Sequence, residues 1–510
     1  MFVLLVFIVF ILLYIYLEGT KNFKYWETKG IKYCKPLPFF GNSCGKYFRQ
    51  ISPTDLLTNI YKTYKDEKCV GIFESNYPAL VIRDPELIKL VLSTDFMHFY
   101  PKGMNMFERE PLMNNLFSAD GDLWKLLRQK FTAAFTTGKM KAMYPILLKQ
   151  VDRLERIICD ASKKNVELDV RDLMARYTID IITNCGFGVD SNSLNDESSV
   201  FRKLGKRIFN IKYRDSFVYM FKFIATNTFK NFNFFAPEIE DSTTEIFEYI
   251  LEQRNNMPNR QDFMDILLQM RDKNTLSGDS LTKRNKDGEP EKCEIILNKT
   301  LLIAQAFILF AAGYETAAAA ISFTLNQLAY NQEIQRKCQD EVDKVLKKHG
   351  ELTYEAVIEM KYLEMVFKEG MRMYPPIGFL IRQCARKYTF SDINLTIDKG
   401  IAIFIPLQAL QNDETYFEQP EKFIPERFHP DNAEKLNKFS YLPFGAGPRL
   451  CIGMRFGILE SVAGLAKIFQ KYSVMPSTNS RLDLVTDPTI ALVQNIKGGI
   501  PLKFVRRRMI

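Results

Sequence analysis

The residues most clearly suited to do chemistry lie near the C-terminus, in the run YLPFGAGPRLCIG at 441–453. Gly445 and Gly447 permit a tight loop with positive φ, and Pro448 stiffens it. Cys451 then precedes a long amphipathic stretch, so the free N–H groups and the dipole of a helix N-terminus favour its thiolate form. A structural cysteine is the ordinary alternative. The neighbouring residues instead indicate a mount for a metal-bound sulfur, and a cysteine thiolate is a proximal ligand that haem iron uses.

A second candidate is an acid and an alcohol inside the longest apolar run, residues 300–330. A second membrane span is one interpretation of this run, but Glu315 at its centre would cost roughly 2.5–3.5 kcal/mol in lipid. A long helix through the middle of a globular domain fits better. Gly313 leaves a gap in the side chains of such a helix. The Thr316 hydroxyl can hydrogen-bond to the backbone of its own helix or to a bound molecule. An acid and an alcohol beside a gap are typical of proton delivery.

The chain that must position these groups has 510 residues, of which 46% are hydrophobic, enough for a large core. It has nine cysteines without a C-x-x-C pair and only three histidines. This pattern disfavours a zinc ribbon, a covalently attached c-type haem and a disulfide scaffold, and most cysteines are expected to be reduced and buried. The net charge of +9 is too small and dispersed to indicate nucleic acid, but it suits a membrane surface or an acidic partner.

The N-terminal segment predicts a membrane signal anchor at 1–20. Its first seventeen residues carry no charge, fourteen of them are Phe, Val, Leu or Ile, and five lysines follow by residue 35. This order leaves the rest of the chain in the cytosol. A cleaved signal peptide is the alternative, but a basic n-region and a small-x-small cleavage site are lacking. Residues 21–42 predict a basic, proline-rich hinge, and residues 43–510 the catalytic domain.

The remaining patterns predict a mainly α-helical domain with a small β-rich lobe. Residues 69–92 predict two short strands around a turn at Asn76, followed by a helix that Pro85 opens. Residues 271–294 are charged and predict a surface linker. The aromatic stretch 215–235 is either a buried helix or a membrane-dipping lid over a substrate entrance.

Together these residues resemble the cytochrome P450 family. Residues 444–453 fill every fixed position of its haem-binding signature, F-x-x-G-x-R-x-C-x-G. AGYET at 312–316 is similar to the oxygen-activating stretch of the family's central helix, and EGMR at 369–372 matches E-x-x-R. The resemblance covers nearly the whole chain. It implies the family's α+β fold, mainly α with a small β-rich lobe, a long central helix and a cysteine-loop haem mount.

The resemblance also implies a set of site residues. Cys451 is the implied iron ligand, and Thr316 with Glu315 is implied to deliver protons to dioxygen. The positions implied at the haem are Trp124, Arg128, Arg382, Arg449, Phe444, Gly445 and Gly453. Glu369, Arg372 and Arg427 are implied as a buried ion-pair triad, whereas spacing alone would suggest a surface pair. The implied lining of the substrate pocket is Phe107, Ala312, Ile377 and Leu492.

The expected function is that of a membrane-anchored monooxygenase with haem b, which inserts one oxygen atom from O2 into lipophilic small molecules. The chain looks most like the insect microsomal branch that oxidises plant toxins and insecticides, some relatives of which process hormones or pheromones. It is expected at the cytosolic face of the endoplasmic reticulum. Two alternatives stay open: a haem-thiolate isomerase or dehydratase, against which the intact 312–316 run argues, and a non-catalytic haem or lipid binder.

Electrons are expected from NADPH through a separate reductase, since the chain has no Rossmann glycine fingerprint. Cytochrome b5 is a further partner that the resemblance allows. Lys125 and Lys130 share a helix with Trp124, on the side that the family presents to the acidic flavin domain of the reductase; a solvated helix face is the alternative. One departure from the family is the pair Gln411 and Asn412, where related enzymes often carry His and Arg. It puts one local hydrogen bond in doubt.

Overall fold

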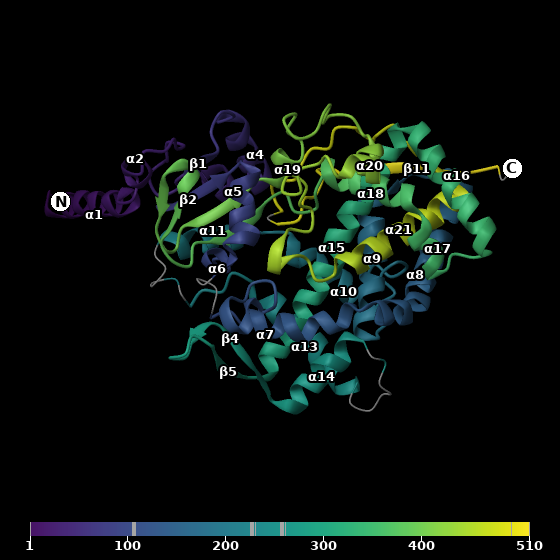
Figure 1. Cartoon of the computed structure of the whole chain (residues 1–510), viewed down its shortest axis with the longest axis horizontal. Helices are drawn as coiled ribbons and strands as arrows, with labels where there is room; N and C mark the ends of the chain where they lie inside the picture. The colour runs from purple at the N-terminus through teal and green to yellow at the C-terminus, as the bar shows by residue number, and fades with distance from the viewer. Residues whose placement is uncertain are drawn as a thin grey trace.

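The computed structural model describes residues 2–104, 109–224, 229, 231–254, 260, 262–490 and 492–508. Helices make up most of the body, β1 and β2 lie toward the N-terminal side, β11 lies near the C-terminus, and helix α1 projects away from the body (Figure 1). The predicted fold class, mainly α with a small β-rich lobe, is confirmed.

The α-helices are α1 (Phe2–Thr20), α2 (Tyr25–Thr28), α3 (Cys44–Tyr47), α4 (Pro53–Thr63), α5 (Pro85–Lys89), α6 (Phe96–Phe99), α7 (Gly121–Thr132), α8 (Thr137–Lys164), α9 (Val170–Ile182), α10 (Val200–Phe209), α11 (Tyr213–Ile224), α13 (Pro237–Arg254), α14 (Phe263–Lys273), α15 (Lys299–Tyr330), α16 (Gln332–His349), α17 (Tyr354–Glu359), α18 (Lys361–Met373), α19 (Leu407–Leu410), α20 (Pro430–Ala433) and α21 (Met454–Lys471). The strands are β1 (Cys69–Glu74), β2 (Tyr77–Ile82), β3 (Leu168–Asp169), β4 (Thr275–Arg284), β5 (Pro290–Ile296), β6 (Leu380–Gln383), β7 (Tyr388–Phe390), β8 (Leu395–Ile397), β9 (Ala402–Ile405), β10 (Tyr472–Pro476) and β11 (Pro501–Arg506).

The β-rich lobe is built on a sheet with the strand order β1–β2–β9–β6. β2 pairs in parallel with β9, and the other neighbours are antiparallel. The two predicted strands around Asn76 and the helix opened by Pro85 are both present, and Asp84 caps that helix by accepting hydrogen bonds from two backbone N–H groups. Every residue of β1 is buried, so protein covers both faces of this strand.

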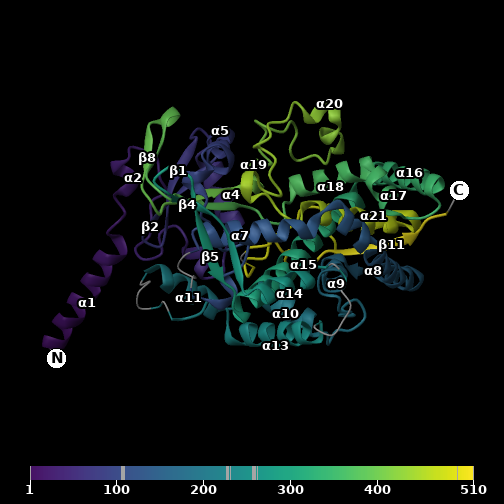
Figure 2. The same ribbon diagram turned by 60° about the horizontal axis from the view of Figure 1, so that its bottom comes forward.

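The predicted central helix is α15, which runs through the middle of the molecule (Figure 2). It crosses two hydrophobic clusters. Its first half lies in a cluster with α7, α13 and α14, here the α13 cluster. Its second half lies in a cluster with α8, α9, α18 and α21, here the α21 cluster. Among the described residues, α15 has the length and hydropathy of a membrane span, but 72% of that stretch is buried in protein. Its apolar character therefore serves the core.

A third cluster, the lobe cluster, joins the sheet to α5 and includes Trp26, Ile82 and Leu92. The segment 442–452, here the cysteine loop, meets all three clusters. Phe444 packs against the α21 cluster, Ile452 against the α13 cluster and Ala446 against the lobe cluster. The loop therefore lies where the separate cores of the molecule converge.

Residues 271–294, predicted to be a surface linker, are mostly a β-hairpin, so that prediction is wrong. β4 and β5 pair from Thr275 opposite Ile296 to Arg284 opposite Pro290. The turn contains Asp-Gly at 287–288, a strong hairpin signal, with Gly288 at a φ of 81°. The hairpin lies on α7, where Asp122 accepts hydrogen bonds from Ser280 and Leu281. Much of the hairpin faces solvent, so its strands contain many charged residues and lack the alternation of apolar and polar residues that indicates a strand.

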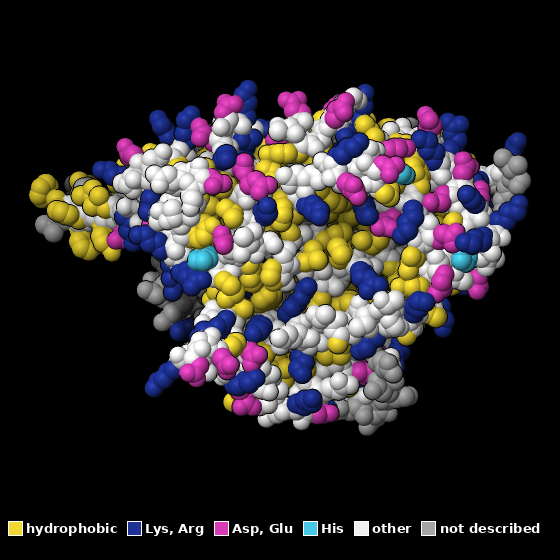
Figure 3. Space-filling model, in the orientation of Figure 1, with side chains coloured by type: hydrophobic (Ala, Val, Ile, Leu, Met, Phe, Trp, Pro, Cys, Tyr) yellow, Lys and Arg dark blue, Asp and Glu magenta, His cyan; other side chains and the backbone are white. Residues whose placement is uncertain are grey.

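The segment 21–42, predicted to be a hinge, is packed onto the lobe. Trp26 is fully buried and donates from Nε1 to the Ile72 carbonyl at 2.9 Å. A Cβ at Gly71 would lie 2.4 Å from the Trp26 ring, so the strand must pass close to it. In contrast, the described apolar side chains of α1 are largely exposed (Figure 3). The boundary between the exposed helix α1 and the segment that packs onto the lobe therefore lies before Trp26.

Part of the aromatic stretch 215–235 forms α11. Tyr213 and Phe221 on this helix are exposed, whereas Lys222 is buried and pairs with Glu110 at 2.5 Å. Residues 225–228 and 230 lie outside the described residues. One face of α11 is therefore buried, as expected for a buried helix, and another face is exposed, as a membrane-dipping segment would require.

Candidate active site

The cysteine loop turns tightly at two glycines. Gly445 and Gly447 have φ values of 75° and 69°, in the region that favours glycine. A Cβ at Gly447 would lie 1.8 Å from the carbonyl oxygen of Leu92, so a side chain cannot be accommodated there. The φ-positive loop that the sequence predicts is therefore present, and it is pressed against the lobe.

Cys451 differs from the other cysteines in its environment. All nine are free thiols, and Cys451 is exposed while the other eight are buried or half-buried. Its N–H donates to the Phe444 carbonyl at 2.9 Å, and α21 begins just after the N-cap residue Gly453. Surrounding protein raises the pKa of the Cys451 thiol, whereas the Gly453 N–H and the charges of Arg128 and Lys102 lower it. Cys451 is thus accessible although protein surrounds it, and cations lie beside it; this accessible space is here called the hollow.

Trp124 and Arg449 hold one side of this hollow. The Arg449 guanidinium lies 4.4 Å from the centroid of the Trp124 ring, within cation–π range. Arg449 Nη2 also donates to Asp120 Oδ1 and to the Ala119 carbonyl, both at 2.8 Å. The start of α7 therefore fixes the arginine of the cysteine loop.

Four cations surround the hollow: Lys102, Arg128, Arg382 and Arg449. Burial and the neighbouring Arg449 lower the pKa of Arg382 to about 9, and burial lowers that of Arg449 to about 10. The Nε atoms of both arginines are buried without a hydrogen-bond partner among the described residues. Asp120 is the carboxylate beside them, so the cluster carries an excess of positive charge. The two propionates of a haem fit this set as counter-charges and as acceptors.

Lys102 and Asp120 are members of this cluster that sequence reasoning missed. Lys102 precedes Gly103 in an irregular loop, and its ammonium lies 3.6 Å from the centroid of the Phe117 ring. Asp120 directly precedes α7, at the position before a helix that acidic residues often fill. The position before a helix could have identified Asp120 from the sequence, whereas no sequence pattern surrounds Lys102.

One face of α15 is only partly covered by protein. Ile308, Ala312 and Thr316 recur every four residues and are exposed or half-buried in a helix that is otherwise mostly buried. Thr316 donates from Oγ1 to the Ala312 carbonyl at 2.8 Å, which leaves its lone pairs as acceptors. A Cβ at Gly313 would lie 2.7 Å from Ile182 Cδ1, so close helix packing explains this glycine.

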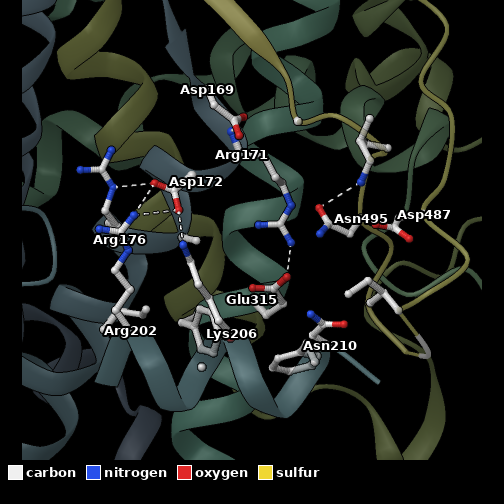
Figure 4. Close-up of a pocket in the computed structure, with 18 of the residues that line it drawn as sticks. Asp169, Arg171, Asp172, Arg176, Arg202, Lys206, Asn210, Glu315, Asp487 and Asn495 are labelled. Carbon is white, nitrogen blue, oxygen red and sulfur yellow. Dashed lines mark hydrogen bonds and ion pairs between the residues drawn. The ribbon is translucent and has the colours of Figure 1, made fainter. Parts of the chain in front are cut away.

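Glu315 points away from that face. Its Oε1 forms a buried ion pair with Arg171 Nη2 on α9 (Figure 4). Consecutive residues of a helix diverge by about 100°, so Glu315 and Thr316 serve different sides of α15. The structure therefore does not bring the two predicted proton-delivery groups together. No motif in the sequence marks Arg171 as the partner.

The predicted ion-pair triad is assembled in the interior. Arg372 donates from Nε and Nη2 to the Glu369 carboxylate at 2.8 and 3.0 Å, and Arg427 Nε approaches the same group at 3.4 Å. Gln411 and Asn412, the departure from the family, both contact Arg372. Its Nη1 donates to the Gln411 carbonyl at 2.9 Å and to Asn412 Oδ1 at 3.2 Å. The Asn412 bond comes from a side-chain amide and the Gln411 bond from the backbone, whereas the Gln411 side chain donates from Nε2 to the Arg372 carbonyl at 3.2 Å.

The four predicted pocket residues are placed unevenly. Phe107 lies outside the described residues. Ala312 is on the open face of α15, whereas Ile377 and Leu492 are half-buried on two other segments. An isolated β-bridge between Ile377 and Val493 joins those segments. The structure therefore brings Ile377 and Leu492 near each other and leaves Ala312 on a separate element.

The mainly α fold and an accessible cysteine beside a buried excess of positive charge fit a haem oxygenase, and comparison with known proteins agrees. The family model described as Cytochrome P450 matches residues 32–501. The chain belongs to the cytochrome P450 family. Haem is accordingly its cofactor, electrons come from a redox partner, and the protein is a monooxygenase.

The relatives are insect proteins that match over most of their length. Cytochrome P450 6k1 of Blattella germanica is 35% identical over 501 residues, covering 96% of this chain and 94% of the relative. Cytochrome P450 6B1 of Papilio polyxenes is 35% identical over 492 residues, covering 96% of each. Cytochrome P450 6B5 of Papilio glaucus is 36% identical over 469 residues, covering 91% and 96%. The predicted resemblance to the insect branch is confirmed.

Proposed function

We propose that this protein is a membrane-bound monooxygenase that oxidises lipophilic small molecules, among them plant toxins and insecticides, with electrons from NADPH through a separate reductase. The observation that carries the proposal is the open Cys451 thiol beside a buried excess of positive charge. Similarity to insect cytochromes P450 over nearly the whole chain supports the choice of substrate class.

Each residue around the hollow is assigned a separate role in binding haem. Cys451 Sγ is assigned as the iron ligand, and the Gly453 N–H stabilises its thiolate by a hydrogen bond. Phe444 and Gly445 shape the loop that carries it. Propionate binding is assigned to Lys102, Arg128, Arg382 and Arg449, with Trp124 holding Arg449 in place. When bound, the haem supplies the activation of dioxygen, which thiolate ligation favours.

Proton handling is assigned to Thr316. Because Oγ1 donates to the Ala312 carbonyl, its lone pairs can accept a hydrogen bond from a water on the open face. A water held there can pass a proton toward the reacting oxygen. Glu315 has a supporting role: its carboxylate must leave Arg171 before it can exchange a proton with this face.

The face that carries α7 is the proposed docking surface for the reductase. Lys130 is exposed near the end of α7, whereas Lys125 donates to the Ser280 carbonyl of the hairpin at 3.5 Å. Figure 3 shows Lys and Arg side chains around a recessed apolar area on this face of the molecule. An acidic partner surface would be steered to such a place.

Charge reversal at Lys130 tests this docking. Lys130→Glu should raise the reductase concentration needed for half-maximal turnover by about three- to tenfold and weaken its salt dependence. Lys164→Glu, an exposed position at the far end of α8, is the matched control. If the two variants give the same titration curve, the α7 face is not the docking surface.

The membrane anchor is assigned to α1, with the catalytic domain at the cytosolic face of the endoplasmic reticulum. At 1.5 Å per residue its 19 residues span about 28 Å, close to the apolar thickness of that membrane. Its described apolar side chains are exposed, and lysines follow it. The exposed Tyr213 and Phe221 of α11 offer a second contact with lipid.

The reaction is tested with purified protein, reductase, NADPH and a panel of lipophilic plant compounds and insecticides. Products are scored by mass spectrometry for the gain of one oxygen atom. We expect product only when both NADPH and the reductase are present. Product formed from organic peroxides without either of them would instead support the isomerase or dehydratase alternative.

A further inference from the structure

The end of helix α1 is bonded to other segments of the chain. The last carbonyl groups of a helix have no partner within the helix, so other groups must supply one. Asn76 Nδ2, in the turn between β1 and β2, donates to the Glu18 carbonyl at 3.1 Å. The Phe39 N–H donates to the Gly19 carbonyl at 3.5 Å, and Asn22 Nδ2 donates to the Asn76 carbonyl at 3.0 Å. Three hydrogen bonds therefore join the end of α1 to the lobe and to the segment packed on it.

Gly19 lies directly on the Phe39 ring. Gly19 is buried, whereas the described apolar side chains of α1 are largely exposed. A Cβ at Gly19 would lie 2.7 Å from Cδ1 and Cε1 of Phe39, so a larger residue would push the ring away. Glycine inside a helix costs stability relative to alanine. The close contact with the ring explains why the apolar helix carries a glycine at this position.

Phe39 is held in a backbone conformation that bulky residues rarely adopt. Its φ is 65°, in the left-handed region that favours glycine. On either side of it, Leu37 and Gly41 exchange two backbone hydrogen bonds of 2.8 Å. Asn42 exchanges two more of 2.8 Å with the backbone of Phe73 on β1. Strain of this kind persists only where the surrounding structure fixes it, so Phe39 is a rigid support for α1.

Exposed aromatic side chains continue from this junction onto α11. Tyr77 directly follows Asn76, is 44% exposed and meets the Phe223 ring of α11 at a centroid distance of 6.0 Å. The same helix exposes Tyr213 and Phe221. In both ribbon views α11 lies toward the end of the molecule from which α1 projects (Figure 1, Figure 2). An apolar face suited to lipid therefore adjoins the base of α1.

We propose that Gly19, Asn22, Phe39 and Asn76 form an anchor clamp, which joins α1 and the lobe into one rigid unit and fixes the angle at which the catalytic domain sits on a lipid surface. The face formed by Tyr77 and α11 is thereby held against the lipid. This inference rests on the proposed role of α1 as the membrane anchor. Because lipophilic substrates concentrate in lipid, a fixed angle keeps one face of the domain beside them.

A flexible tether is the alternative, and it predicts a different behaviour. Without the clamp, the six residues between Gly19 and Trp26 would link α1 to the packed body. A flexible chain of that length has an end-to-end distance of roughly 13 Å, so α1 would swing through a wide range of angles. The clamp instead predicts a single angle. A distance measured between α1 and the lobe separates the two cases.

Spin labels measure that distance in the full-length, haem-loaded protein. They are attached through p-acetylphenylalanine, which leaves the nine cysteines untouched, at Leu5 on α1 and at Lys62 on α4, both of which are exposed. Double electron–electron resonance in phosphatidylcholine vesicles should give one narrow distance distribution for the parent. A free tether would broaden that distribution by about 10 Å or more.

Two variants open the clamp from opposite sides. Gly19→Leu places a side chain against the Phe39 ring and makes α1 more apolar, so membrane insertion is retained. Phe39→Gly removes the ring and suits the positive φ, so the turn itself is not strained. We expect both variants to broaden the distribution by about 10 Å. Tyr16→Leu, an exposed change one turn earlier in α1, is the matched control and should give the distribution of the parent.

A single label at Tyr213 on α11 reports contact with lipid. In the parent, oxygen, which concentrates in lipid, should relax this label more strongly than a water-soluble nickel complex does. In Gly19→Leu this preference should be lost, because the domain no longer holds one face to the lipid.

The clamp, the lipid-facing surface and the anchor are refuted by different results. A broad distribution in the parent, or equal distributions in both clamp variants and the control, would show that α1 and the lobe are not clamped. A Tyr213 label that prefers the nickel complex in the parent would show that the α11 face is not held to lipid. Failure of the parent to sediment with vesicles would refute the anchor itself, and the same distances, measured in detergent, would then decide whether the clamp exists.

Discussion

Replacing Glu369 with glutamine removes one negative charge from a fully buried ion pair and keeps the shape of the side chain. The Glu369 carboxylate accepts hydrogen bonds from Arg372 at 2.8 and 3.0 Å and from the Ile424 N–H at 2.9 Å. Arg427 approaches it at 3.4 Å. In Glu369→Gln, the amide nitrogen would face guanidinium donors and could not accept from them.

The cost can be estimated from the partners that remain. Breaking a buried ion pair by removing one member costs about 3–5 kcal/mol. We expect the lower end, because Arg372 keeps its hydrogen bonds to the carbonyl oxygens of Gln411, Pro420 and Lys422. The free energy of unfolding should therefore fall by about 3 kcal/mol, roughly a hundredfold in the folding equilibrium.

Urea titration of the haem-loaded protein, followed by circular dichroism and by the haem absorption band, measures this loss. Glu364→Gln is the matched control on the same helix. Glu364 pairs with Lys361 and Lys368 at 3.4 and 2.8 Å where solvent reaches it, so its loss should cost less than about 1 kcal/mol. If both variants lose the same free energy, within about 0.5 kcal/mol, the reasoning about burial is refuted.

Three further predictions concern ligand, anchor and proton. Cys451→His should retain some haem but lose the red-shifted carbon-monoxide spectrum of thiolate-bound ferrous iron, because imidazole donates less charge; an unchanged spectrum would assign the ligand to another cysteine. Deleting residues 2–20 should release much of the protein from membranes in a sedimentation assay without loss of haem, since Trp26 and the core remain; haem loss would contradict an independent domain. Thr316→Ala should form less product and more hydrogen peroxide per NADPH consumed, whereas Thr316→Ser should stay coupled; equal coupling in both variants and the parent would contradict the role of the hydroxyl.

The parts of the site that could be predicted from the sequence are those whose residues lie in short runs. The turn at Gly445 and Gly447 follows from local φ preferences, and its consequence for Cys451 follows from the helix start beyond it. The length of α15 and the gap at Gly313 are likewise local features of one apolar run. Such features need no knowledge of distant contacts.

The parts that could not be predicted depend on contacts between distant segments. Glu315 and Arg171 are 144 positions apart, and nothing near either residue indicates the pairing. Lys102 reaches the cluster of cations beside Cys451 from an irregular loop, where no periodicity orients a side chain. The hairpin at 275–296 was missed for another reason: it is largely exposed, so charged residues are tolerated in strands that would otherwise alternate.

Because the cysteine loop contacts the α13, α21 and lobe clusters, the retention of haem should depend on the packing of each of these three clusters. Gly447 meets the Leu92 carbonyl in the lobe, Phe444 packs against the α21 cluster and Ile452 against the α13 cluster. Contacts between segments so distant in sequence form late in folding, since loop closure costs entropy before the contacts repay it. We therefore expect Cys451, the proposed iron ligand, to reach its position only after the clusters have formed, and a newly made chain to acquire haem as one of its last steps. A destabilising substitution in any of the three clusters should shorten the residence time of haem before helix content falls.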